Sequence, residues 1–248
     1  MNKILSCFRK SLLPVIAVVV AGVLFSACLK DNDGDNSQIP AAGLMAFNLA
    51  PDQQSLVIRL SGNSLTNSPL AYQSFTGVYQ NIYTGNRSVG AFDYLSSTPL
   101  VASNHSFEQG KYYSLFVVGL DSNYRNVIST DNFDSLSASS GKAFVRYINA
   151  VIDSVNTANV TITSGGSSVV NHNAAYATVS EFKEVAPGEI TIAVKSNNGV
   201  DVNRTISVEA KKVYTILLSG VPGATDENTK VQIKFVTNGT LTDDPSKS

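Results

Sequence analysis

Residues 230–235 read KVQIKF, and this stretch decides the fold class. Its side chains alternate strictly, so Val231, Ile233 and Phe235 share one face of an extended strand, while the polar residues share the other. A helix would spread these three side chains around its axis, because its period is 3.6 residues. The stretch therefore predicts a β-strand with one buried face.

The same alternation recurs in short segments rich in β-branched residues. The clearest examples are Val160 and Ile162, then Ile190, Ile192 and Val194, then Ile206 and Val208. Turn-forming residues separate the segments at short intervals, as at Asn63, Pro99, 197–199 and 222–223. After residue 40, no stretch has the pattern of a long amphipathic helix. We therefore predict an all-β chain of antiparallel strands.

The composition is that of a globular protein with a substantial core, with 43% hydrophobic and 15% charged residues. Lys and Arg together number 18 and Asp and Glu number 19, so the formal net charge is −1. A nucleic-acid-binding protein needs a basic face to neutralise phosphates. We therefore expect no nucleic-acid partner.

The chain contains an internal repeat with an offset near one hundred residues. Residues 110–120 resemble residues 210–220, and residues 45–50 resemble residues 146–150. The runs 112–120 and 213–218 within this repeat alternate less than the other segments. Such runs predict central strands that are covered on both faces.

The repeat predicts two tandem immunoglobulin-like antiparallel β-sandwich domains. We place the first sandwich at 43–136 and the second at 143–240, followed by a tail at 241–248. Between them, small polar residues predict a linker at 137–142.

Residues 1–27 have the layout of a secretory signal peptide. The basic residues Lys3, Arg9 and Lys10 precede an uncharged run that is too short to span a membrane comfortably. The sequence Ser26-Ala27-Cys28 then resembles the lipobox of bacterial lipoproteins, although Phe25 stands where an aliphatic residue is usual. The resemblance implies acylation of Cys28, with fatty acids such as palmitate, and a membrane anchor.

The residues after this cysteine indicate where in the cell the protein is located. Lys30, Asp31, Asp33 and Asp35 lie in an acidic linker, 28–42, which resembles the export signal of Bacteroidota surface lipoproteins. The resemblance implies a lipid-anchored protein displayed on the outer membrane. A calcium loop is the competing interpretation, but the sequence has no Gly at the loop's sixth position and no Glu at its twelfth. We therefore predict no metal site.

Both repeats resemble a bacterial family named domain of unknown function 4397. In the second repeat, the resemblance lies in residues 145–150, 185–192 and 213–216. In the first, it lies in residues 48–52 and 56–62. Asn48 and Asn149 stand where the family usually has His. The family implies secreted or surface β-sandwich modules and no known reaction.

The sequence has no pattern of a catalytic site. Its two histidines, His105 and His172, each lie in a stretch rich in Asn and Ser, which predicts exposed turns. The sequence has no G-x-S-x-G elbow and no His-Glu pairing suited to zinc. We therefore expect no catalytic residue, no enzymatic activity and no cofactor.

An aromatic cluster and two serines are candidate surface sites. Tyr72, Tyr79 and Tyr83, with Phe75, Phe92 and Tyr94 nearby, are candidates for stacking on sugar rings. Packing inside a sandwich is the alternative for these rings, and the chain has no Trp. Ser135 and Ser154, each between Asp and an aliphatic residue, resemble the acceptor motif for O-glycosylation in exported Bacteroidota proteins.

Together these observations predict a lipid-anchored, non-catalytic cell-surface protein that serves interaction, adhesion or spacing, with a glycan or protein ligand. Two alternatives stay open. The protein could be a glycan-binding accessory lipoprotein of a nutrient-uptake system, or a subunit of a surface fibre whose edge strands pair between chains.

Overall fold

The computed structural model describes residues 39–153 and 157–242. Several predicted features lie outside these residues: the signal peptide at 1–27, Cys28, Lys30, Asp31, Asp33, Asp35, Ser154 and most of the C-terminal tail. Their assignments stay predictions.

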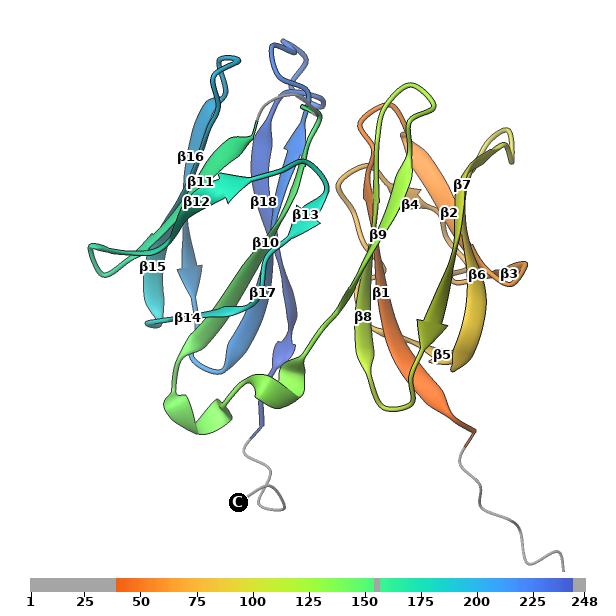
Figure 1. Ribbon diagram of the computed structural model, residues 1–248, viewed down its shortest axis with the longest axis horizontal. Helices are drawn as coiled ribbons and strands as arrows, with labels where there is room; N and C mark the ends of the chain where they lie inside the picture. The colour runs from red at the N-terminus through yellow and green to blue at the C-terminus, as the bar shows by residue number, and fades with distance from the viewer. Residues whose placement is uncertain (1–38, 154–156, 243–248) are drawn as a thin grey trace, which may run out of the picture. The chain divides into compact units, whose positions relative to one another are not determined.

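The first module is a β-sandwich of two facing sheets (Figure 1). One sheet has the order β5-β1-β8-β9, and the other has the order β3-β2-β6-β7 with β4 also paired to β2. The strands are β1 (Ala41–Leu49), β2 (Ser55–Leu60), β3 (Asn63–Ser64), β4 (Leu70–Ala71), β5 (Gln80–Tyr83), β6 (Gly85–Asp93), β7 (Pro99–Phe107), β8 (Tyr112–Val118) and β9 (Arg125–Thr130).

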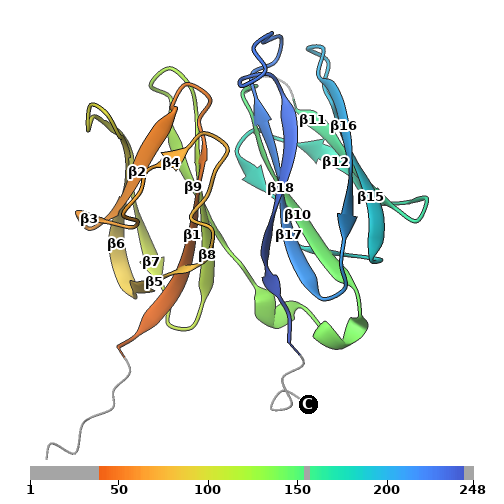
Figure 2. The ribbon, with the colours of Figure 1, turned by 180° about the vertical axis from the view of Figure 1, so that it is seen from behind.

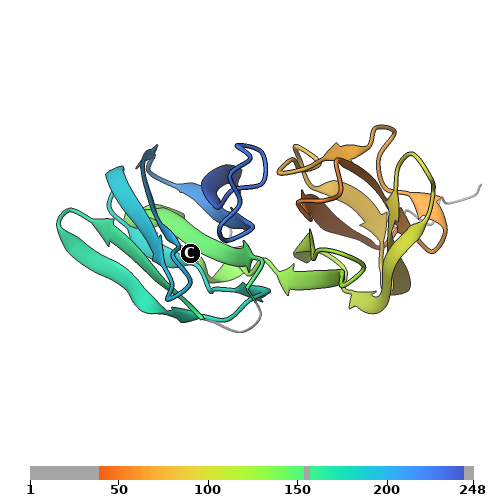
Figure 3. The same cartoon turned by 90° about the horizontal axis from the view of Figure 1, so that it is seen from above.

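The second module repeats this architecture. Figure 2 shows β17 and β18 in one layer and β15 and β16 in the other, and Figure 3 shows the layers of each module from above. Its sheets have the orders β13-β10-β17-β18, with β14 also paired to β10, and β12-β11-β15-β16. The strands are β10 (Ala143–Val151), β11 (Ala158–Ser164), β12 (Ser167–Ala174), β13 (Thr178–Val179), β14 (Lys183–Val185), β15 (Gly188–Lys195), β16 (Asp201–Val208), β17 (Lys212–Gly220) and β18 (Gln232–Thr240).

The predicted all-β fold of two sandwiches is confirmed, with one difference in strand direction. In each module the first strand pairs in parallel with a later strand, β1 with β8 and β10 with β17. The other strand pairs are antiparallel. Alternation of side chains has period 2 in both arrangements, so it does not distinguish them.

The register of these parallel pairs defines the repeat. Leu44 lies opposite Tyr113 in the first module, and Val145 lies opposite Tyr214 in the second. Both members differ by 101 residues between the copies (145 − 44 and 214 − 113). Positions 101 apart in these strands are therefore structurally equivalent.

Each sandwich has its own core, and the predicted alternating residues lie in the second one. Ile233 belongs to this core, and Val231 and Phe235 pack against it half-buried, so the KVQIKF stretch presents the face that its pattern predicts. The other predicted alternating residues, Val160, Ile162, Ile190, Ile192, Val194, Ile206 and Val208, are buried in the same core.

A third apolar cluster joins the two modules. Because of this cluster, β8 and β17 are buried almost throughout, as predicted. The strands β1 and β10 are buried in the same way, which was not predicted from the sequence. Because successive side chains point to opposite faces, one face of each strand packs into its own sandwich and the other into this cluster. Its buried members are Met45, Phe47, Leu49, Phe116, Val118, Ile148, Ala150, Leu217 and Val236.

The segment between the modules contains two short 3-10 helices, η1 (Phe133–Ser135) and η2 (Ala138–Ser140). Gly141 ends η2 in the left-handed conformation, where glycine has no steric penalty. Both modules fall within one compact unit of the chain. Among the residues that the structure describes, no helix has the length and apolar character that crossing a membrane requires.

Candidate functional site

The most deeply buried charges of the described chain form a single ion pair. Arg146 on β10 donates from Nη1 to Asp131 Oδ1 at 2.5 Å, and their side chains are 2% and 0% exposed. Asp131 directly follows β9 in the first module, so the pair bridges the two modules. Its charges are shielded from water far more than those of a surface pair.

Both partners of the ion pair make further hydrogen bonds. Arg146 Nη2 donates to Ser114 Oγ at 2.8 Å, and its Nε donates to Thr215 Oγ1 at 3.0 Å. Asp131 Oδ2 accepts from Ser114 Oγ at 2.7 Å and from the Tyr79 hydroxyl at 2.5 Å. A buried charge is tolerated when its remaining donors and acceptors are paired in this way.

Aromatic rings cover this network. The Arg146 guanidinium lies 4.4 Å from the ring centroid of Phe182. The ring of Tyr79 makes edge contacts with Tyr112 at 5.1 Å and with Phe133 at 5.8 Å. Burial raises the pKa of the Tyr79 hydroxyl far above its usual value, and the negative charge of Asp131 raises it further. Tyr79 therefore serves the network as a neutral donor.

Asn48 and Asn149 have the same role in the two modules. Asn48 Nδ2 donates to the carbonyls of Gln53 and Leu70, at 2.8 and 3.1 Å, while its Oδ1 accepts from the Ala50 amide at 3.1 Å. Asn149 makes the corresponding three bonds, at 3.0, 3.2 and 3.2 Å. Each asparagine is buried and ties its strand to backbone carbonyls outside that strand, those of Gln53 and Leu70 in the first module and those of Ala174 and Ala175 in the second. This role is structural.

A tyrosine hydroxyl fixes the chain before the buried strand in each copy. The amide of Glu108 donates to the Tyr113 hydroxyl at 3.0 Å, and the amide of Glu209 donates to the Tyr214 hydroxyl at 3.0 Å. This arrangement is similar to the tyrosine corner of immunoglobulin-like sandwiches, in which a Tyr hydroxyl bonds to the backbone a few residues upstream.

The predicted aromatic cluster is not gathered into one platform. Tyr79 turns into the buried network, and Phe75 stacks on Phe47 at 5.5 Å. Tyr72 is half-buried beside Ser219 and Gln73, and burial raises its pKa. Tyr83 is exposed on β5. Tyr112 and Phe133 could not be identified from the sequence as partners of Tyr79, because Tyr112 lies on β8 and Phe133 lies in η1, both far from Tyr79 in the chain.

The two histidines lie on edge strands, and their prediction as turn residues is wrong. His105 lies on β7, where its ring contacts Phe107 and Tyr113, and burial lowers its pKa. His172 lies exposed on β12, and its Nε2 is 2.6 Å from the Tyr147 hydroxyl. Edge strands expose polar side chains as turns do, so their composition looks alike in sequence.

Ser135 lies exposed at the end of η1, where its hydroxyl donates to the Asn132 carbonyl at 2.7 Å. Its glycosylation stays a prediction. Within residues 39–153 and 157–242, no three acidic, His or Cys side chains gather as metal ligands would.

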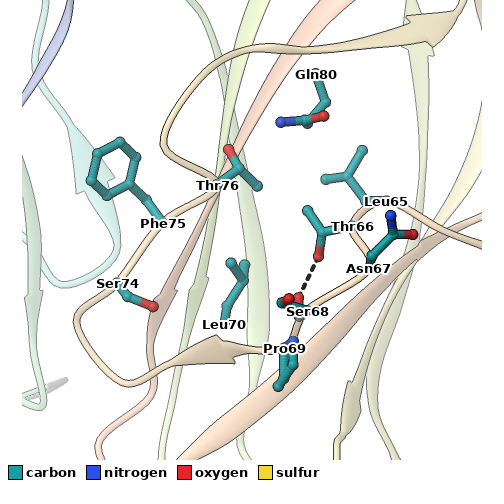
Figure 4. A pocket seen from close by; sticks show the side chains of 10 residues that line it. All are labelled: Leu65, Thr66, Asn67, Ser68, Pro69, Leu70, Ser74, Phe75, Thr76 and Gln80. Carbon is teal, nitrogen blue, oxygen red and sulfur yellow. Dashed lines mark hydrogen bonds between the residues drawn. The ribbon is translucent and has the colours of Figure 1, made fainter.

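A pocket of about 380 Å³ opens beside β1 in the first module (Figure 4). One side comes from the loop between β3 and β4, and the other from the chain between β4 and β5. The lining residues are Leu65, Thr66, Asn67, Ser68, Pro69, Leu70, Ser74, Phe75, Thr76 and Gln80. None of these side chains is charged. Of the lining residues, only Phe75 was among the candidates predicted from the sequence.

Both loops are held by hydrogen bonds to the sheets. The Leu65 amide donates to the Ile58 carbonyl at 2.8 Å, and the Thr76 amide donates to the Ala46 carbonyl at 3.0 Å. The Ser74 carbonyl accepts from the Asn48 amide at 3.1 Å. The lining is therefore set in place by the sandwich itself.

No curated protein matches the chain. Among the solved structures that resemble it are three with weak similarity, each matched over 80% of this chain. The tip fimbrial protein Mfa3 from Porphyromonas gingivalis is 8% identical over 99% of its chain, with a TM-score of 0.28. The carbohydrate-binding module CBMbc of Eubacterium rectale Amy13K, solved with maltoheptaose, is 12% identical over 97% of its chain, with a TM-score of 0.24. A putative cell adhesion protein from Bacteroides eggerthii is 10% identical over 94% of its chain, with a TM-score of 0.23. Because the TM-scores are this low, the functions of these proteins are not assigned to this chain.

The family model described as a domain of unknown function, DUF4397, matches the chain twice, over residues 42–156 and 143–247. The first match covers the first sandwich and continues through β10, and the second covers the second sandwich, so the buried parallel pairs β1 with β8 and β10 with β17 lie within the matched residues. The chain belongs to this family.

Proposed function

We propose that the protein is a lipid-anchored cell-surface module of the outer membrane, which acts without catalysis in interaction, adhesion or spacing. The observation that supports this most is the interlocked pair of modules. An element that holds a binding partner at a distance from a membrane must keep its own parts together, and here they share one apolar cluster and one buried ion pair.

Separating the modules would be costly. It would expose the apolar side chains of Phe47, Phe116 and Leu217 to water, at about 25 cal/mol per Å². It would also split Arg146 from Asp131, and breaking a buried pair typically costs about 3–5 kcal/mol. A tandem held in this way can transmit position or force from one end to the other.

The leader of the chain supports the location. The lipobox-like sequence before Cys28 would direct acylation, and two or three acyl chains on one cysteine anchor a protein stably. The acidic residues that follow resemble an export signal and support display outward.

Labelled palmitate tests the anchor. We expect the wild-type protein to incorporate the label and Cys28→Ala to lose it, while Cys7→Ala, the matched control in the leader, keeps it. Protease added to intact cells should digest the protein. Retained label in Cys28→Ala contradicts the anchor, and full protection from protease contradicts surface display.

A further inference from the structure

The pocket of Figure 4 has features that the fold itself does not require. In the second module, β12 runs from Ser167 to Ala174 alongside β11 as a nearly continuous strand. In the first, the equivalent strand is interrupted: Ser64 pairs with Arg59 and Leu70 with Leu56, so five residues face two on β2. Because one copy of the same sandwich folds without this bulge, stability alone does not explain it.

The bulge supplies half of the pocket. Its residues 65–69 line one side, and the chain from Ser74 to Gln80 lines the other (Figure 4). The volume of about 380 Å³ lies within the range of small-molecule sites, which is about 300–1,000 Å³. Hydrogen bonds already tie both loops to the sheets. Less conformational entropy would therefore be lost when a ligand binds.

Three of the four side-chain hydroxyl groups in the lining are set as acceptors. Thr66 Oγ1 donates its proton to the Ser68 carbonyl at 2.6 Å. Ser74 Oγ donates to the Ala71 carbonyl at 2.7 Å, and Thr76 Oγ1 donates to the Val78 carbonyl at 2.9 Å. Thr76 Oγ1 also accepts from the Ala46 amide at 3.3 Å, which leaves it one lone pair. A hydroxyl that has donated its single proton keeps lone pairs to receive one.

The side-chain amides of Asn67 and Gln80 supply the donors. Figure 4 draws one hydrogen bond among the lining residues, from Thr66 to Ser68, so neither amide is bonded to another lining residue. Each amide has two N–H donors and an acceptor oxygen. The half-buried ring of Pro69 and the side chain of Leu65 add apolar surface beside them.

We propose that this pocket binds a neutral sugar unit of a polysaccharide. Sugar hydroxyls both donate and accept hydrogen bonds, which fits the mixture of oriented acceptors and amides, and the C–H face of the ring fits the apolar residues. A charged ligand would lose its hydration on binding, and the lining has no charged side chain to compensate for that loss. The proposal goes beyond the anchor and spacer role and does not depend on it.

A second pocket provides the matched control. It lies in the second module, has a volume of about 410 Å³, and is lined by Asn203 and Gln232. Unlike the first pocket, it contains the charged residues Arg204, Glu227 and Lys230. A substitution of its Asn and Gln changes the same side chains in a site of similar size.

Calorimetric titration of the full-length chain in detergent tests the proposal, with gluco-, manno-, galacto- and xylo-oligosaccharides as probes. We expect at least one to bind, and Asn67→Ala/Gln80→Ala to weaken that binding by about tenfold or more. Asn203→Ala/Gln232→Ala should bind like the wild type. Unchanged melting temperatures confirm that both variants are folded.

Three results would overturn the proposal: no binding by any of the four probes, full binding by Asn67→Ala/Gln80→Ala, or equal weakening in the control variant. Oligogalacturonate, which is charged, should not compete. Because the pocket does not need the anchor, Cys28→Ala should bind sugar normally. Failure of the pocket and failure of the anchor are therefore distinguishable.

Discussion

Replacing Asp131 by Asn tests whether the ion pair holds the modules together. The substitution preserves the size of the side chain but leaves Arg146 charged, buried and without a counter-charge. Removing one partner of a buried pair costs about 3–5 kcal/mol. Because Arg146 keeps its bonds to Ser114 and Thr215, we expect a loss of about 3 kcal/mol, at the lower end of that range.

The loss can be measured by urea unfolding followed by circular dichroism. Asp201→Asn is the matched control, since Asp201 pairs with Lys195 at 3.2 Å and both side chains are 64% exposed. An exposed pair contributes about 0–1 kcal/mol, so this variant should unfold almost like the wild type. Equal losses in the two variants would refute the argument that burial of the pair determines its effect.

A double-mutant cycle separates the pair from its surroundings. Arg146→Met combined with Asp131→Asn should be more stable than the sum of the single losses predicts, because the second change removes the charge that the first leaves unpaired. Simple additivity would show that the two charges do not act on each other.

Two further predictions concern a glycine and a tyrosine. Gly220 has a φ of +127°, and a Cβ there would meet the backbone of Lys230, so Gly220→Ala should lower the unfolding free energy by more than about 1 kcal/mol, while Gly239→Ala, with open space around it, should lower it less. The Tyr79 pKa is raised in the folded protein, so its contribution is fully present below the unfolded value of about 10 and is lost as pH rises above it. Tyr79→Phe should therefore lose less stability between pH 9 and 11 than the wild type in urea titrations at each pH; an identical decline would contradict the assignment.

The strands of the second sandwich could be predicted from the sequence because each has one apolar and one polar face. Ile190, Ile192 and Val194 show this pattern and lie in the core as expected. The strands β1 and β10 gave no such signal, because both of their faces are buried, one of them against the other module. Periodicity reports a contrast between faces. Where the contrast is absent, an unbroken apolar run is the remaining signal, and polar residues such as Asn48, Arg146 and Asn149 interrupt that run in β1 and β10.

The site residues were less predictable. Arg146 sits inside an apolar run, which is a signal of a paired buried charge, but nothing in the order of residues identifies Asp131 as its partner. The pocket depends on a bulge opposite β2, and a bulge changes the number of residues facing a strand without changing their type. Such features arise from pairing between segments and become visible only in three dimensions.

The apolar cluster between the modules also limits how this architecture could grow. Phe47 and Ile148 are 101 residues apart, as are Phe116 and Leu217, so both copies contribute the same face to the cluster. Contacts between like faces close upon themselves, whereas chains of units need two different faces. A third repeat fused to this protein would find that face occupied on both neighbours, and gene duplication alone would not extend the pair into a longer array.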